Sequence, residues 1–168
     1  MVLTDLVQIR RIGEKQRHEN LRFRAWLKRH NFVERRLKAI AEDVEERTDC
    51  TACGNCCRVA TTQLNQRDVE RLARFMGMKL PQFLRDYTVE TGDEGLILKR
   101  TEHGCVFLEG NVCSVYEGRP ETCRLFPHLV KGSGSFVSRM WHMPDRAVYC
   151  PIVFNSLEAF KEETGFKK

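Results

Sequence analysis

The sequence predicts a mainly helical fold with a small β-hairpin and a long amphipathic helix near the N-terminus. Apolar residues recur at helical spacing over residues 18–47, and further short helical segments follow. A glycine–asparagine pair separates two short apolar runs near residue 110, as in a tight hairpin. There is no coherent parallel-sheet pattern and no evident internal repeat, so we expect helices with one small sheet element.

The composition is that of one soluble globular chain. Of 168 residues, 42% are hydrophobic and 30% are charged, which is enough to bury an ordinary core. No apolar run approaches the roughly 18 residues of a membrane helix, and the first residues lack a signal peptide's apolar segment. We therefore expect a cytoplasmic protein in reducing surroundings, with no membrane partner.

The formal net charge of +5 comes mainly from the Lys/Arg-rich N-terminal third. The simplest interpretation is the solvated face of a helix, and the alternative is a docking surface. We expect a protein partner there; a nucleic-acid partner is possible in principle, but no motif supports it.

The first expected element is a basic amphipathic helix over residues 18–47. His30 and Asn31 could kink or split it. Its apolar side, expected to pack in the core, comprises Phe23, Trp26, Leu27, Val33, Leu37, Ile40, Ala41 and Val44.

The later elements are short. Asn65 and Asp68 predict an N-capped helix through about residue 76, and Pro81 opens another over residues 80–87. Strands are expected at 95–100 and at 105–116, the latter turning at Gly110–Asn111. One helical turn at 119–127, a flexible loop at 131–135 and a C-terminal helix capped by Asn155 or Ser156 complete the chain.

The most specific feature is "CTACGNCC", residues 50–57, which has the spacing C-x2-C-x2-C-C. Two-residue gaps let a tight turn bring thiolates to one side of the backbone, near enough for one metal ion. Three such thiolates with a remote Cys–Pro resemble the chemistry of ferredoxin cluster sites. The candidate metal ligands are all eight cysteines: Cys50, Cys53, Cys56, Cys57, Cys105, Cys113, Cys123 and Cys150.

The division of these thiols among metals stays open. Neighbouring side chains usually diverge, so Cys56 and Cys57 are expected to serve two centres or two irons of one cluster. Eight thiols fit two four-thiolate sites or one four-iron cluster with four to spare. A two-residue turn would pair Leu108 with Cys113 and Cys105 with Tyr116, placing Cys105 and Cys113 on opposite faces, whereas a three-residue turn at 109–111 would place both on one face. The sequence does not decide between these registers.

Cys123 is expected to be a stabilised thiolate. It lies in the first turn of a short helix, between Arg119 and Arg124. Arg58 and Arg124 are expected to donate hydrogen bonds to sulfur. No nucleophile elbow, phosphate loop or zinc-protease motif is present, so no enzyme activity is assigned.

The segments "CTACGNCC", "GCVFLEGNVCSVYEGRPETCRLFP" and "YCP" together resemble the CxxCxxCC, or YkgJ-like, cysteine-cluster proteins. The resemblance covers residues 50–151 and implies a zinc- or iron-chelating domain. We expect three parts: a basic helical segment at 1–48, which lies outside the resemblance, a cysteine-cluster metal-binding domain at 49–152 and a C-terminal helix at 153–168.

We expect a single domain organised around metal. A [4Fe–4S] cluster is favoured over Zn²⁺, and the role expected is that of a redox, electron-transfer or accessory component. The alternative is a structural zinc module acting through protein or nucleic-acid contacts.

Overall fold

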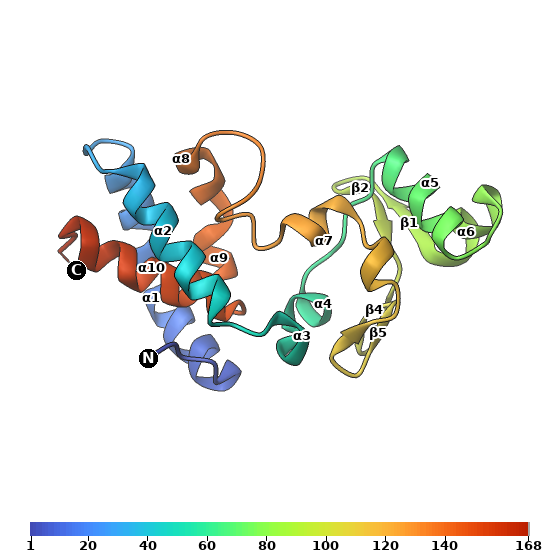
Figure 1. Cartoon of the computed structure of the whole chain (residues 1–168), viewed down its shortest axis with the longest axis horizontal. Helices are drawn as coiled ribbons and strands as arrows, with labels where there is room; N and C mark the ends of the chain where they lie inside the picture. Colours follow the sequence, from blue (N-terminus) through green and yellow to red (C-terminus); the bar gives the residue numbers. More distant parts are fainter. Residues whose placement is uncertain (168) are drawn as a thin grey trace. The chain divides into compact units, whose positions relative to one another are not determined.

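In the computed structural model, which describes residues 1–167, the chain divides into two compact units (Figure 1). Unit 1 consists of Met1–Asp49 together with Pro127–Lys168, and unit 2 is Cys50–Phe126. The structure is mainly helical with small antiparallel strand pairs, which confirms the predicted fold class. None of the helices in the described part of the chain combines the length and apolar character needed to cross a membrane.

Unit 1 is a group of helices whose buried side chains come from both ends of the chain. Helix α10 packs against α2 and α1, and α9 packs against α1. Phe23, Leu37 and Phe160 are among the largest side chains that this packing buries. The helices are α1 (Leu6–Leu27), α2 (Glu34–Glu46), α8 (Phe136–Arg139), the 3-10 helix η2 (Met140–His142), α9 (Met143–Arg146) and α10 (Pro151–Thr164).

The N-terminal helix is long, as predicted, but it begins earlier and is split. Asp5 caps α1, because its carboxylate accepts from the backbone N–H groups of Val7 at 2.9 Å and Gln8 at 3.0 Å. The helix ends at Leu27, and the predicted interruption at 30–31 lies in the break before α2.

The C-terminal helix also begins earlier than predicted. Pro151 opens α10, so Asn155 is not its N-cap. Asn155 instead accepts from the Leu3 backbone N–H at 2.9 Å and donates to the Leu3 carbonyl at 2.8 Å. Gly165 ends the helix in the left-handed conformation, near the predicted position.

Unit 2 contains short elements, most of them at the predicted places. Asn65 and Asp68 form the predicted capping box of α5. The helices are α3 (Cys50–Cys53), α4 (Asn55–Val59), α5 (Gln66–Phe75), α6 (Leu80–Tyr87), the 3-10 helix η1 (Tyr116–Gly118) and α7 (Glu121–Leu125).

Three antiparallel strand pairs accompany these helices, where the sequence predicted one hairpin. They pair β1 (Thr88–Thr91) with β2 (Gly95–Leu98), β3 (Arg100–Thr101) with β4 (Gly104–Cys105), and β5 (Leu108–Glu109) with β6 (Val112–Cys113).

The predicted two-residue turn at Gly110–Asn111 is present, and Leu108 pairs with Cys113. Cys105, however, pairs with Arg100 and not with Tyr116. The ribbon stops at Cys113, because Tyr116 belongs to a 3-10 helix. The argument that Cys105 and Cys113 face opposite sides of one ribbon therefore does not apply.

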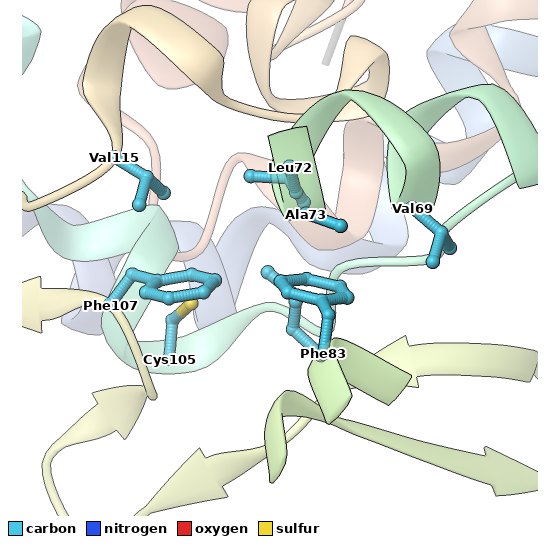
Figure 2. Packing of buried hydrophobic residues seen from close by; sticks show 8 residues of the cluster. Val69, Leu72, Ala73, Phe83, Cys105, Phe107 and Val115 are labelled. Atoms are coloured by element: carbon cyan, nitrogen blue, oxygen red, sulfur yellow. The ribbon is translucent and has the colours of Figure 1, made fainter. Parts of the chain in front are cut away.

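The core of unit 2 joins α5 and α6 to the cysteine-bearing strands (Figure 2). The rings of Phe83 and Tyr87 stack at 5.5 Å, and those of Tyr87 and Phe107 at 5.0 Å. Its buried members are Val69, Leu72, Ala73, Phe83, Leu98, Cys105, Phe107 and Val115.

Candidate metal centre

Seven of the eight cysteines lie in unit 2, and Cys150 lies in unit 1. Cys150 is buried and immediately precedes α10. The other seven come from four places: α3 and α4, the end of β4, the end of β6, and α7. Unit 2 therefore carries the whole C-x2-C-x2-C-C segment and three of the four later cysteines.

The cysteine segment folds as two one-turn helices joined by Gly54. Gly54 has φ +58°, and a Cβ at this position would lie 2.7 Å from the carbonyl oxygen of Asn111. Only glycine allows the β5–β6 turn to approach this closely. The Asn111 side-chain amide also donates to the Ala52 carbonyl at 2.9 Å. The tip of the hairpin is thereby fastened to the helix that carries Cys50 and Cys53.

Cys56 and Cys57 do not diverge as expected from their adjacency. Their Sγ atoms lie 4.0 Å apart. Both residues belong to α4, where successive side chains are rotated by about 100° and not by the half turn of a strand. Their sulfurs can consequently come together.

Cys105 and Cys113 occupy the same kind of local turn. The backbone N–H two residues later donates to each sulfur, from Phe107 to Cys105 and from Val115 to Cys113. A repeat that the sequence analysis missed accompanies these turns: "CVFLEG" begins at Cys105 and "CSVYEG" begins at Cys113. Both segments have cysteine, glutamate and glycine at the same three positions.

Three of the cysteines are part of the apolar interior of unit 2. Cys105 belongs to the buried cluster, and Cys57 and Cys113 pack against it. Figure 2 shows the Cys105 side chain among these residues, beside the ring of Phe107. An apolar environment with few water molecules strengthens any electrostatic interaction with a bound cation.

Cys123 lies on α7 and is mostly enclosed. Burial raises the pKa of its thiol to about 12, although a hydrogen bond with Thr62 opposes the shift. The Thr62 Oγ1 and Cys123 Sγ atoms are 3.7 Å apart. The expectation that Cys123 is a stabilised thiolate is therefore wrong for the metal-free chain. Desolvation outweighs the dipole of a helix that has a single turn.

The flanking Arg119 acts on Tyr116 and Cys113, where the sequence predicted an effect on Cys123. Arg119 stacks on the ring of Tyr116 at 3.7 Å and donates to the Tyr116 carbonyl at 2.7 Å. Its charge lowers the pKa of Cys113, although burial raises that pKa more.

The thiols of Cys57, Cys105, Cys113 and Cys123 lie within electrostatic reach of one another. Burial is the main cause that raises the pKa of Cys105, and negative charge on Cys57 and Cys113 raises it further. Burial also raises the pKa of Cys113, and Cys57 adds to it. After burial, the charges of Cys57, Cys105 and Cys113 contribute to the raised pKa of Cys123. In every pair among the four, the charge of one thiolate therefore reaches the other.

Cys57 is the exception among them, because its pKa is lowered to about 7. The hydrogen bond with Cys56 is the largest cause, and the charges of Arg58 and Arg100 also lower it against the effect of burial. Cys57 is therefore more readily ionised near neutral pH than an ordinary cysteine, before any metal binds.

Arg58 and Arg100 hold the cysteine-bearing segments through backbone carbonyls. Arg58 donates to the Cys53 carbonyl at 2.9 Å and to the Gly110 carbonyl at 3.0 Å, and it also bonds the Asn111 side chain. Arg100 donates to the carbonyls of Ala60 and Arg58. These bonds of Arg58 connect α3 to the hairpin through oxygen acceptors, where the sequence predicted a bond to sulfur.

The cysteines suit a thiophilic metal in chemistry, but their side chains must rearrange to chelate one. Within residues 1–167, no three His, Cys, Asp or Glu side chains are arranged closely enough to hold a metal ion. Yet the thiols are clustered, partly buried and supplied with backbone N–H donors, as thiolate sites for zinc or iron require. Side-chain rotation must accompany binding.

A family model described as "Putative zinc- or iron-chelating domain" matches residues 49–151, more than half of the chain and all eight cysteines. The chain belongs to the CxxCxxCC family. The resemblance seen in the cysteine spacing is thereby confirmed.

Among curated proteins, the chain is similar to an uncharacterized protein of Methanocaldococcus jannaschii. The two are 29% identical over 84 residues, which are 49% of this chain and 45% of the archaeal protein. The matched part is less than half of that relative's length. No solved structure matches the chain.

Proposed function

We propose that this CxxCxxCC-family chain holds an iron–sulfur cluster through its cysteines and serves as a redox, electron-transfer or accessory component. The observation that carries the proposal is the family match over all eight cysteines, seven of which lie in one compact unit. The candidate ligands remain Cys50, Cys53, Cys56, Cys57, Cys105, Cys113, Cys123 and Cys150. A [4Fe–4S] cluster would supply one-electron transfer.

The C-x2-C-x2-C segment supports iron in this proposal, because three closely spaced thiolates with a remote Cys–Pro are typical of cluster sites. The second candidate is a structural zinc module that acts through its surface. Buried thiols in turns with N–H···S bonds favour it, since zinc prefers closed thiolate sites. Either metal needs reduced thiols, so the cytoplasm is the compartment that we propose.

The proposed docking surface for a protein partner is the exposed side of α1. Arg11, Lys15, Arg22 and Arg29 are all exposed on or directly after this helix. Their successive spacings of four and seven residues place them on one side of it, away from the buried Phe23 and Leu27. A partner with an acidic surface would complement this charge.

Purification of the full chain without oxygen tests the proposed cofactor. We expect a brown protein that contains iron and acid-labile sulfide, measured by elemental analysis and visible absorption. The variant Cys53→Ser should lose much of the iron, whereas the control Ser114→Ala should keep it. A colourless protein with stoichiometric zinc would select the second candidate. A protein that takes up neither metal would contradict both.

Zinc affinity is expected to rise steeply with pH through neutrality. Cys105, Cys113 and Cys123 have raised pKa values, so all three are protonated at pH 7 and must release a proton to bind as thiolates. Each released proton multiplies the affinity by about ten per pH unit, which gives about a thousandfold for three. Competition with a chromophoric chelator between pH 6 and 7 measures this slope. A rise of about tenfold or less would contradict it.

A further inference from the structure

We propose that Cys57, Cys105, Cys113 and Cys123 form one closed, tetrahedral four-thiolate site for a single divalent ion such as Zn²⁺, distinct from Cys50, Cys53 and Cys56. The inference rests on the proposed function, in which the cysteines bind metal. It goes further by dividing the adjacent pair: Cys57 belongs to the closed site and Cys56 to the other set.

The first step is the contact between α4 and β4, which places Cys57 beside Cys105. These two elements pack against each other. A Cβ at Gly104 would lie 2.5 Å from the Cys57 carbonyl oxygen and 2.8 Å from the Arg58 Cα. The residue directly before Cys105 therefore lies against the backbone of Cys57, and no side chain separates the two segments.

The second step is the pair of equivalent turns at Cys105 and Cys113. Each sulfur accepts a backbone N–H from the residue two positions later, Phe107 or Val115. Such N–H groups are unusual partners for a neutral thiol but stabilise a metal-bound thiolate. Cys57, Cys105 and Cys113 also share one apolar cluster, which would exclude water from a bound ion.

The third step brings in Cys123 from α7. The first N–H of α7, from Glu121, donates to the buried Asp68 carboxylate of α5 at 2.9 Å. Thr62, which follows α4, lies 3.7 Å from the Cys123 sulfur. Cys123 is thus held toward the segment that carries Cys57, and its thiol is within electrostatic reach of Cys57, Cys105 and Cys113.

The surrounding charge fits a four-thiolate metal centre. One divalent ion with four thiolates carries a net charge of about −2. Arg58 and Arg100 lie within electrostatic reach of Cys57, Arg100 also reaches Cys105, and Arg119 reaches Cys113. The three guanidinium groups would offset much of the negative charge of such a centre.

The Cys56 sulfur is the competitor that the experiment must exclude. It lies 4.0 Å from the Cys57 sulfur, close to the edge of about 3.8 Å in a tetrahedral site with Zn–S bonds of about 2.3 Å. Cys56 and Cys57 are adjacent and chemically identical. Substituting each of them singly therefore shows which of the two sulfurs belongs to the closed site.

The test uses the full chain loaded anaerobically with Co²⁺ or Zn²⁺. The tetrathiolate absorption of Co²⁺ and the zinc content report the site. We expect Cys57→Ser and Cys105→Ser to lose about one equivalent of zinc and the Co²⁺ tetrathiolate spectrum, while Cys56→Ser and Cys50→Ser keep both. Equal loss in Cys56→Ser and Cys57→Ser, or full retention in Cys105→Ser, would overturn the division.

A second measurement needs no substitution, so a misfolded variant cannot obscure the answer. The wild-type chain with one equivalent of Zn²⁺ is treated with N-ethylmaleimide, and modified cysteines are mapped by mass spectrometry. We expect Cys57, Cys105, Cys113 and Cys123 to be protected together and Cys50 and Cys53 to be modified. Protection of Cys50, Cys53 and Cys56 instead would overturn this inference and leave metal binding intact. A wild-type chain that takes up no metal would overturn the proposed function and this inference with it.

Discussion

Replacing Asp68 with alanine is expected to lower the free energy of unfolding by about 2 to 4 kcal/mol, because it removes a buried carboxylate whose charge-assisted hydrogen bonds contribute about 1.5 to 3 kcal/mol each. The Asp68 side chain is 3% exposed, and its Oδ1 atom lies 2.5 Å from the Arg71 guanidinium. The same oxygen accepts the Glu121 backbone N–H at 2.9 Å, which anchors α7. The substitution would leave Arg71 and α7 without this acceptor, and urea unfolding of the metal-free chain measures the loss.

Asp86→Ala is the matched control for this prediction. Asp86 also pairs with an arginine, Arg85, at 2.9 Å, but both side chains are well exposed to solvent. Exposed ion pairs contribute at most about 1 kcal/mol. If the two alanine variants lost similar stability, Asp68 would not be the buried anchor of α7. Measuring the zinc affinity of the same two variants shows whether loosening α7 also weakens metal binding.

Gly104→Ala is expected to destabilise unit 2 by about 3 to 5 kcal/mol, through overlap with backbone atoms and unfavourable dihedral angles together. Gly104 has φ +127°, which L-residues rarely adopt, and its new Cβ would lie 2.5 Å from the Cys57 carbonyl oxygen. The nearest atoms are all backbone atoms of Cys57 and Arg58, so no flexible side chain could move away. The cysteine segments of α4 and β4 would have to separate, so zinc affinity should fall as well.

Gly110→Ala separates the effect of the dihedral angle from that of the close contact. Gly110 has φ +61°, yet nothing lies within 4 Å of the position that its Cβ would take. In this variant the free energy of unfolding should fall only by the cost of a non-glycine residue in the left-handed conformation, about 1 to 2 kcal/mol. Its zinc affinity should be unchanged. Thermal unfolding compares the stability of the two glycine variants, and chelator competition compares their zinc affinity. Equal effects at the two glycines would show that contact between α4 and β4 is unimportant.

The elements that the sequence predicted well are those with local causes. The capping box of α5 uses Asn65 and Asp68, three residues apart, and the hairpin turn uses Gly110 and Asn111. The start of α10 was misplaced because two local signals compete, and the proline at 151 prevails over Asn155, which binds the N-terminal segment. Such a long-range bond cannot be read from neighbouring residues.

The candidate site shows the same division between local and distant causes. Cysteine spacing was sufficient to indicate metal chelation, which family membership supports. The protonation of Cys123 was predicted wrongly, because burial depends on residues such as Thr62 that are distant in sequence. The equivalent turns at Cys105 and Cys113 had a sequence signal, the repeated cysteine–glutamate–glycine spacing, and a search for short repeats would have found it.

The segments that make up the two units decide when each unit can fold during synthesis on the ribosome. Unit 2 is one uninterrupted segment, whereas unit 1 is assembled from both ends. Helices α1 and α2 leave the ribosome before unit 2, whereas α10, against which both pack, is made after it. All seven cysteines of unit 2 are therefore available to capture an ion while the earliest helices still await their partner. Loading during translation thus requires no opening of a finished helical unit.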